Sequence, residues 1–286
     1  MEYINLKAYA KINLGLDVIG ILDNGYHNVR MIMQSVDIFD KVNIYRTNGR
    51  NVMMKTNLSY LPSGPDNLVY KAAMLMKKTY GICEGMDIDL YKFIPVSAGM
   101  AGGSSDAAAV LKGINILWDI GASEDELMEL GAQLGADVPY CVMGGTALAE
   151  NIGEKLTKLK DCPKCTVVIG KPYLRVSTKY VYDKLVIDEN TVHPDIDGMV
   201  EAINNGDING IATRLSNVLE TVTETENPVI SHIKKLMKDN GAMGALMSGS
   251  GPSVFGLFEN EGVAAECNNA LRKSGFVRNS YIAHMI

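Results

Sequence analysis

The chain has 286 residues, of which 47% are hydrophobic, so it is long enough for one large or two ordinary globular domains with a packed core. Its formal net charge of -6, without any basic run, counts against nucleic acid as a partner. Its apolar runs stay well short of the roughly 20 residues that span a bilayer, and no signal-like segment opens it. We therefore expect a soluble, cytoplasmic protein that binds neither nucleic acid nor membrane.

The five cysteines, an odd number, indicate reduced thiols rather than a disulfide framework. Cys162 and Cys165 have the spacing of a metal-binding pair. One such pair supplies only half of the ligands of a tetrahedral zinc site, so two free thiols near a domain junction are the favoured interpretation.

A first long strand is predicted over residues 4–18, where apolar residues alternate with the others. Its second face carries Lys11 and Asn13, whose side chains point the same way and could share a ligand. A solvated lysine on the outer face of a sheet is the alternative.

Two short turns follow in the sequence. Asn24 and Gly25 predict a tight turn, because both residues tolerate positive φ, and Tyr26 and His27 come directly after it. Asn48-Gly49 predicts a β-hairpin between strands 42–45 and 52–55.

A helix is predicted after the hairpin. Asp66 is a suitable N-cap, and Leu68, Ala72 and Leu75 share the inner face of the expected helix.

The segment of residues 95–105, here named the first glycine loop, lies between a predicted strand, 86–94, and a predicted helix, 107–118. Pro95 ends the strand because it cannot donate to a ladder, and the glycines lack a Cβ that would keep an anion from the backbone. The two serines suit a helix N-cap, and the unpaired N–H groups of the next turn attract a phosphate. The spacing fits neither a Walker A loop nor Gly-x-Gly-x-x-Gly. A tight turn that packs a helix on a strand is the alternative. The candidate anion-binding residues are Pro95, Gly99, Met100, Ala101, Gly102, Gly103, Ser104 and Ser105.

A candidate catalytic carboxylate comes after the next helix. That helix begins with a capping box at residues 123–126 and is expected to stop at Gly135. Asp137 follows at once, and Pro139 should hold Val138 extended, which gives Asp137 a rigid seat. An aspartate that only satisfies turn amides is the alternative.

The polar stretch 150–165 marks the predicted passage between domains 1–155 and 156–286. A buried strand, 166–169, is followed by a helix-like stretch that contains Tyr180 and Tyr182, and then by two or three helices over 195–240. Residues 248–251, the second glycine loop, separate two strands. The order helix, strand, strand, helix, strand indicates a ferredoxin-like half. A glycine-rich β-turn is the alternative for this loop.

Four of these segments together resemble the conserved segments of the GHMP small-molecule kinases. The run 10–14, which contains Lys11, resembles the first motif; the first glycine loop resembles the second motif, with Gly103 as one additional glycine; and the run 247–251 resembles the third. Residues 135–139 match the catalytic aspartate segment, and the resemblance covers nearly the whole chain. It implies an α+β, two-domain GHMP kinase fold, with an N-terminal half like domain 2 of ribosomal protein S5 and a ferredoxin-like C-terminal half.

The resemblance also implies an ATP-dependent kinase. In the family, the first glycine loop holds the ATP phosphates, the lysine that matches Lys11 lies beside the transferred phosphoryl group, and the aspartate that matches Asp137 takes or orients the acceptor hydroxyl. The positions of Asn67 and Lys92 lie near adenine in relatives.

Residues 24–27 further resemble the signature of family members that phosphorylate a cytidyl-diphosphate-linked sugar alcohol for isoprenoid synthesis, with Asn24 in place of an aspartate. In those members an aromatic ring stacks on cytosine and a histidine bonds its edge. Tyr182 aligns with a second stacking aromatic, and Tyr180 is the alternative. The implied substrate contacts are Asn13, Tyr26, His27, Tyr182, Ser248, Gly249 and Gly251.

The implied cofactors are ATP and Mg²⁺, the implied partners are small molecules, and a monomer or weak homodimer is expected. No glutamate clearly occupies the place from which other family members bind the metal. A homoserine or mevalonate type of kinase, a non-catalytic nucleotide-binding protein on the same fold and a nucleic-acid-binding module are the alternative functions.

Overall fold

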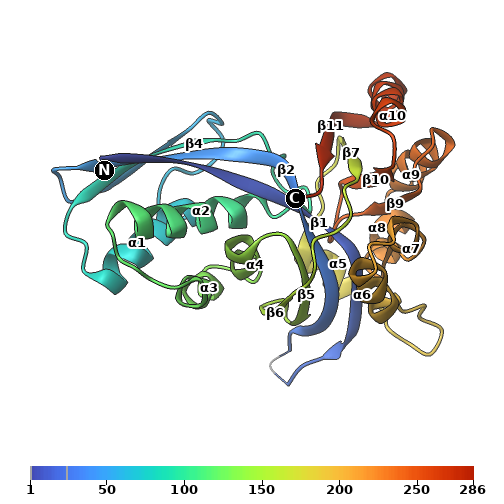
Figure 1. The fold of residues 1–286 in the computed structure, drawn as a ribbon, viewed down its shortest axis with the longest axis horizontal. Helices are drawn as coiled ribbons and strands as arrows, with labels where there is room; N and C mark the ends of the chain where they lie inside the picture. Colours follow the sequence, from blue (N-terminus) through green and yellow to red (C-terminus); the bar gives the residue numbers. More distant parts are fainter. Residues whose placement is uncertain (1, 24) are drawn as a thin grey trace. The chain divides into compact units, whose positions relative to one another are not determined.

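A computed structural model describes residues 2–23 and 25–286 (Figure 1). Asn24, in the first predicted turn, lies outside the described residues. The chain forms two compact units: the first contains Met1–Ala10, Ile38–Val96 and Ala101–Gly144, and the second contains Lys11–Asp37, Ser97–Met100 and Gly145–Ile286. The chain therefore changes unit several times, whereas the predicted boundary was a single cut between residues 155 and 156.

Strands and helices are mixed along the described chain. The strands are β1 (Tyr3–Ile21), β2 (His27–Thr47), β3 (Val52–Thr56), β4 (Gly85–Tyr91), β5 (Thr146–Asn151), β6 (Lys155–Lys158), β7 (Thr166–Pro172), β8 (Ser216–Asn217), β9 (Gly244–Met247), β10 (Val254–Phe258) and β11 (Val277–His284). The helices are α1 (Leu68–Tyr80), α2 (Gly102–Leu117), α3 (Glu124–Ala132), α4 (Val138–Met143), α5 (Thr178–Lys184), α6 (Ile196–Asn204), α7 (Ile208–Thr213), α8 (Glu220–Glu226), α9 (Val229–Asp239) and α10 (Glu261–Ser274).

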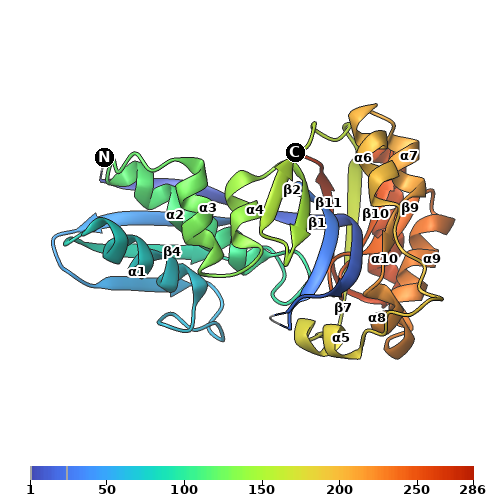
Figure 2. The same ribbon diagram turned by 90° about the horizontal axis from the view of Figure 1, so that it is seen from below.

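The first unit is a sheet covered by helices. Its strands lie in the order β3-β4-β2-β1, and α1 to α4 lie on one face of them (Figures 1 and 2). The apolar sides of the helices and strands form one continuous buried core. Gly113 lets α2 approach the sheet, because a Cβ there would stand 2.6 Å from Cδ1 of Leu6 and 2.7 Å from Cδ1 of Ile44.

The predicted hairpin around Asn48-Gly49 is wrong, because β4 lies between β2 and β3. Ile88 of β4 pairs antiparallel with Ile44 of β2 and parallel with Met54 of β3. Ile88 is fully buried, and a buried apolar strand gains most from neighbours on both sides, so long-range burial overrides the local turn.

The N-cap of the first helix lies one residue later in the sequence than predicted. Asn67, not Asp66, is the N-cap of α1, and its Oδ1 accepts the N–H of Val69 at 2.9 Å. The buried face of the helix includes Ala72 as predicted, together with Val69 and Met76, and the predicted Leu68 and Leu75 are partly buried and pack against the same core.

The strand before the first glycine loop ends at Tyr91, earlier than predicted, so Pro95 does not end it. The backbone leaves the ladder because side chains take over its N–H groups. Asn57 Oδ1 accepts the Lys92 N–H at 2.8 Å, and Asp40 Oδ1 accepts the Ile94 N–H at 2.8 Å. Aspartate and asparagine commonly replace backbone acceptors in this way.

The helix after the first glycine loop starts at Gly102, so the predicted N-cap serines, Ser104 and Ser105, lie inside its first turn. Ala101 is the N-cap, with φ 53° and without a side-chain capping bond. The Ser105 hydroxyl donates instead to the Tyr9 carbonyl oxygen at 2.6 Å, which fixes the start of α2 to β1 within the first unit.

The capping box of α3 is confirmed: Ser123 and Glu126 exchange both bonds. The helix ends at Ala132, before the predicted stop at Gly135. Val138 is the first residue of α4 rather than an extended residue, and Pro139 is tolerated there because the first N–H groups of a helix have no intrahelical partner.

The second unit contains an antiparallel sheet in the order β11-β7-β10-β9. Helices α9 and α10 lie on one side of it (Figures 1 and 2). Together with the predicted order of elements, this arrangement confirms the ferredoxin-like half. The stretch predicted to hold two or three helices contains four, α6 to α9, and the short strand β8. In the same unit β2 pairs with β5, and β5 pairs with β6.

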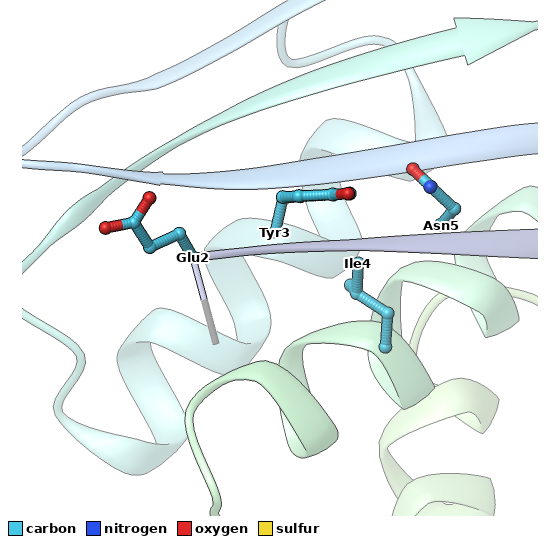
Figure 3. A pocket seen from close by; sticks show the side chains of 4 residues that line it. All are labelled: Glu2, Tyr3, Ile4 and Asn5. Carbon is cyan, nitrogen blue, oxygen red and sulfur yellow. The ribbon is translucent and has the colours of Figure 1, made fainter.

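Strand β1 is longer than predicted and differs along its length. Near its start Ile4 points toward the helices while Tyr3 and Asn5 point to the other face (Figure 3), as the alternation predicts. From Ala10 to Val18 both faces are buried, so Lys11 is not the solvated surface lysine of the alternative interpretation.

A surface depression of about 550 Å³ lies at the start of β1 and is lined by Glu2, Tyr3, Ile4 and Asn5 (Figure 3). It contains none of the predicted site residues. No helix in the described part of the chain is long and apolar enough to cross a membrane.

Candidate active site

Within the second unit, β1 presents a buried polar pair. Lys11 is 5% exposed and donates from Nζ to Oδ1 of Asn13 at 2.7 Å. The Asn13 side chain is fully buried, and its Nδ2 contacts Sδ of Met31 at 3.3 Å. The amide therefore orients the ammonium group, as expected for two side chains that share one face of a strand.

The second glycine loop packs directly on this pair and on part of the first glycine loop. The Ser248 hydroxyl donates to the Gly99 carbonyl oxygen at 2.9 Å, and the Lys11 N–H donates to the Met100 carbonyl oxygen at 3.2 Å. Gly99 has φ +72°, and a Cβ there would collide with the Ser248 carbonyl oxygen. A Cβ on Gly249 would stand 3.5 Å from Oδ1 of Asn13.

These contacts need glycine at two positions of the second unit. Gly99 and Gly249 both have positive φ and both lie against neighbouring polar groups, so a side chain would be strained and would fill the space between the loops. Gly251 closes the second glycine loop by donating its N–H to the Ser248 carbonyl oxygen at 3.0 Å. Segments 11–13, 99–100 and 248–251 therefore come together.

The predicted cytosine-binding residues also lie in the second unit. The rings of His27 and Tyr182 have centroids 4.9 Å apart at an interplanar angle of 46°. Tyr26 is 62% exposed. Tyr180, the alternative to Tyr182, is turned elsewhere: its hydroxyl donates to Oε1 of Glu226 at 2.7 Å. The geometry therefore places Tyr182, and not Tyr180, against the ring of His27.

In the first unit, the beginning of α2 forms the predicted anion-binding end. The first intrahelical bond at this end is the donation from Ser105 N–H to Ala101 O at 2.9 Å, so the N–H groups of Gly102, Gly103 and Ser104 precede the helical ladder. The start of a helix attracts anions through such N–H groups and through the helix dipole.

Lys92 is held by a buried charge cluster beneath this helix end. Its Nζ donates to Asp40 and, at 2.6 Å, to Oδ2 of Asp106 in the first turn of α2. All three side chains are almost fully buried, and a Cβ on Gly102 would stand 3.2 Å from the Lys92 Nζ. Lys92 is therefore an internal partner of two carboxylates rather than an open side chain.

Burial and charge within this cluster shift the pKa values of Asp106 and Lys92. Burial raises the pKa of Asp106 to about 8, against the opposing attraction of Lys92 and with added repulsion from Asp40. Burial lowers the pKa of Lys92, but the two carboxylates outweigh it and raise that pKa overall. At neutral pH the Asp106 carboxyl group is therefore mostly protonated beside the charged Lys92.

Two further predicted residues lie in the first unit. Asn67 caps α1, and its Nδ2 donates to the Pro62 carbonyl oxygen at 2.8 Å, so both ends of its amide have protein partners. Asp137 is half-buried at the N-cap position of α4, but its side chain does not cap that helix.

No group of three or more His, Cys, Asp or Glu side chains in residues 2–23 and 25–286 is placed to hold a metal ion. Cys162 and Cys165 are free thiols, as favoured from the sequence. Burial raises the pKa of each to about 11, so both thiols stay protonated at neutral pH.

Comparison with known proteins places the chain in a family. The model of the GHMP kinases N terminal domain matches residues 67–145, and that of the GHMP kinases C terminal matches residues 199–276. A 4-diphosphocytidyl-2-C-methyl-D-erythritol kinase of Lachnospira eligens is 54% identical over 281 residues, 98% of each chain. The chain belongs to this GHMP kinase family. Another 4-diphosphocytidyl-2-C-methyl-D-erythritol kinase, from Lachnoclostridium phytofermentans, is 55% identical over 92% of this chain and 91% of that protein.

Solved structures agree with the GHMP kinase fold. A crystal structure of 4-(cytidine 5'-diphospho)-2C-methyl-D-erythritol kinase matches with a TM-score of 0.84 at 31% identity and covers 99% of both chains. Homoserine kinase from Cytophaga hutchinsonii matches with a TM-score of 0.76 at 20% identity, over 100% of this chain and 95% of that one, which shows the shared fold alone. The two family models lie on either side of the predicted domain boundary and do not fix its position.

The sequence analysis of this GHMP kinase missed the polar residues that support its loops. Asp40 and Asp106 escaped notice because their roles depend on Lys92, which lies far from Asp40 in the chain. Their one sequence signal is an aspartate at the end of the largely apolar run 36–39 and another inside the small-residue start of α2. Asn217 and Glu220, which contact the second glycine loop, gave no comparable signal.

Proposed function

We propose that this chain transfers the γ-phosphoryl group of ATP to the 2-hydroxyl of 4-diphosphocytidyl-2-C-methyl-D-erythritol, in the non-mevalonate route to isoprenoid precursors. The observation that carries the proposal is the near full-length relationship to kinases of this name at 54% identity. The pairing of His27 with Tyr182 supports a substrate that carries a pyrimidine.

In the proposed complex, the first glycine loop and the start of α2 bind the triphosphate. The N–H groups that precede the helical ladder, together with the helix dipole, attract phosphate oxygens. Gly102 lets the helix start lie close to its support, because a Cβ there would stand 3.0 Å from Cγ2 of Ile94 and 3.2 Å from Nζ of Lys92. Asn67 and Lys92 would contribute by holding this end of the first unit in shape, since both already have protein partners.

Lys11 and Asp137 are the proposed catalytic residues. Phosphoryl transfer demands mainly positioning and charge stabilisation along an in-line path. Lys11, oriented by Asn13, would offset negative charge on the transferred group. Asp137 would accept the proton of the 2-hydroxyl or orient that hydroxyl, and its place at the start of a short helix with Pro139 at its second position gives it rigid backbone support.

The cytidyl group would lie against the rings of His27 and Tyr182. An aromatic face and a ring nitrogen are the groups that stack on a pyrimidine and bond its edge. Tyr26, at 62% exposure, has a ring face open to solvent and would supply the second stacking surface when substrate is bound. The second glycine loop would contact the sugar alcohol and the phosphates through Ser248, Gly249 and Gly251.

Mg²⁺ is the proposed counter-ion of the triphosphate. Mg²⁺ typically retains several waters and takes substrate phosphates as ligands, so the lack of a protein metal cluster among the described residues fits a phosphate-bound ion. When bound, it would supply charge neutralisation on the phosphates.

The test is ADP release by the purified protein with Mg²⁺-ATP and 4-diphosphocytidyl-2-C-methyl-D-erythritol, beside homoserine, mevalonate and phosphomevalonate. We expect turnover with the cytidyl substrate alone, and ³¹P NMR should show a new phosphomonoester on the tertiary carbon. Turnover with another acceptor would replace the substrate and retain the kinase chemistry. No turnover with any acceptor, together with intact ATP binding, would favour a non-catalytic nucleotide-binding protein.

A further inference from the structure

Side chains at the turn between β8 and α8 bond to the backbone of the second glycine loop and of the residue before it. Asn217 is 5% exposed, and its Nδ2 donates to the carbonyl oxygens of Met247 at 2.9 Å and Gly249 at 2.8 Å. Its Oδ1 accepts the N–H of Leu219 at 3.0 Å. Both N–H groups and the oxygen of this buried amide are thus hydrogen-bonded. The two N–H groups bond to Gly249 of the second glycine loop and to Met247, the residue before the loop.

Glu220, three residues after Asn217, also bonds to Met247. Its Oε1 accepts the N–H of Met247 at 2.9 Å, and its Oε2 accepts from Nζ of Lys234 on α9 at 2.7 Å. The N–H and the carbonyl oxygen of Met247 are therefore both bonded to side chains of one turn. Thr223 adds a weaker bond to the carbonyl oxygen of Ser250 at 3.3 Å.

The same turn is in register with the strand that carries the catalytic lysine. Strand β8 pairs parallel with β1, with Asn217 opposite Leu16, and the Val218 N–H donates to the Leu16 carbonyl oxygen at 3.0 Å. Lys11 lies five residues before Leu16 on the same strand. Asn217 is thus bonded to the second glycine loop while its backbone is fixed beside β1.

We propose that Asn217 and Glu220 are positioning residues for phosphoryl transfer, which set the second glycine loop relative to Lys11 and Asn13. The proposal rests on the proposed kinase function. It follows from the geometry because the loop meets the Lys11 and Asn13 pair at close range, with Ser248 bonded to Gly99. A misplacement of about 1 Å in such a site can lower turnover about 100-fold.

Substitutions of Asn217 and Glu220 should remove different numbers of hydrogen bonds. Asn217→Ala removes both donations and leaves two buried carbonyl oxygens without their side-chain donor. Glu220→Gln keeps an acceptor for the Met247 N–H, whereas Glu220→Ala removes it and leaves Lys234 with Glu224 alone. Asn217→Ala and Glu220→Ala should therefore move the loop, and Glu220→Gln should move it less.

Asn268 of α10 offers a matched control. It is also 5% exposed and lies in the second unit, but among the described residues its Oδ1 has no hydrogen-bond partner and its side chain does not bond to either glycine loop. Asn268→Ala removes an equally buried amide without touching the proposed loop support. A loss of activity that follows from general destabilisation would affect both asparagine variants.

The experiment measures turnover, melting temperature and two dissociation constants for wild type and the four variants. We expect kcat of Asn217→Ala and Glu220→Ala to fall about 30- to 100-fold, and Glu220→Gln to fall less than about 5-fold. The Kd of AMP-PNP should rise about 10-fold in the two alanine variants, because a displaced loop fits the phosphates less well. The Kd of CMP, which probes His27 and Tyr182, should stay within about twofold of wild type. Asn268→Ala should match wild type in every functional value.

Equal kcat and equal AMP-PNP affinity in Asn217→Ala and Asn268→Ala would overturn the inference. So would parallel loss of AMP-PNP and CMP binding in Asn217→Ala, which indicates general unfolding rather than a displaced loop. If Asn217→Ala does not fold, the contrast between Glu220→Gln and Glu220→Ala decides. A wild-type protein without turnover would refute the proposed function. The inference would then still be tested by comparing the AMP-PNP affinity of Asn217→Ala with that of Asn268→Ala, and that of Glu220→Ala with that of Glu220→Gln.

Discussion

Replacement of Asp106 by asparagine should make the stability of the protein less dependent on pH. The Asp106 carboxyl group shares the ammonium of Lys92 with Asp40 in a buried cluster. Asparagine keeps an oxygen that can accept from Lys92 and carries no charge, so it resembles the protonated form of the acid. The substitution therefore removes a titration while it retains the main contact of the side chain.

The magnitude follows from the raised pKa. A carboxyl group whose pKa rises from 3.8 to about 8 on folding holds a proton that the unfolded chain has released, throughout that pH window. Its contribution to stability is complete below the lower value and is lost as pH rises through the upper one. At about 1.4 kcal/mol per pKa unit, the difference amounts to roughly 6 kcal/mol over the window. Lys92 stays charged throughout, because its own pKa is raised.

The assay is urea-induced unfolding of wild type and Asp106→Asn at several pH values from 5 to 8. We expect the free energy of unfolding of wild type to fall relative to the variant by roughly 3 to 4 kcal/mol across this range. Asp89→Asn is the control, because Asp89 lies in the same unit, is partly buried and pairs with the exposed Lys55 at 3.3 Å. Parallel curves for wild type and Asp106→Asn would refute the reasoning.

Three other predictions concern the site itself. Gly99→Ala should lower kcat at least about 100-fold because its Cβ meets the second glycine loop, whereas Gly121→Ala, at a similar φ of +77° but with nothing within 4 Å, should cost only about 1 kcal/mol of stability; equal activities would contradict this. Tyr182→Ala should raise KM for the cytidyl substrate about 10-fold with KM for ATP unchanged, and Tyr180→Ala should change neither; the reverse pattern would assign the stacking role to Tyr180. Asp137→Asn should lower kcat about 100-fold or more with substrate affinity preserved, and near wild-type turnover would remove the base assignment.

Local chemistry made several features predictable. The capping box of α3 depends on groups within one turn, so residues 123–126 were sufficient to predict it. The strand alternation of residues 4–18 and the helix after the first glycine loop were predictable for the same reason. The resemblance added the kinase motifs, and the comparisons confirm the family.

Predictions failed where a distant residue decided the outcome. The chain leaves β4 before the first glycine loop because Asn57 and Asp40, far away in the sequence, accept the N–H groups of residues 92 and 94. The serines at the start of α2 do not cap it, because Ser105 donates to Tyr9 instead. Asn48-Gly49 forms no hairpin because β4 enters between the two strands.

The sequence by itself determined the family, the order of the elements and the residue types at the loops, since these are written in local spacing. Only the tertiary structure decided that Lys11 is buried and oriented by Asn13, that Tyr182 rather than Tyr180 meets His27, and that Asn217 supports the second glycine loop. The physical reason is that a buried polar group must find its hydrogen-bond partner wherever the folded chain brings one, at whatever distance in sequence.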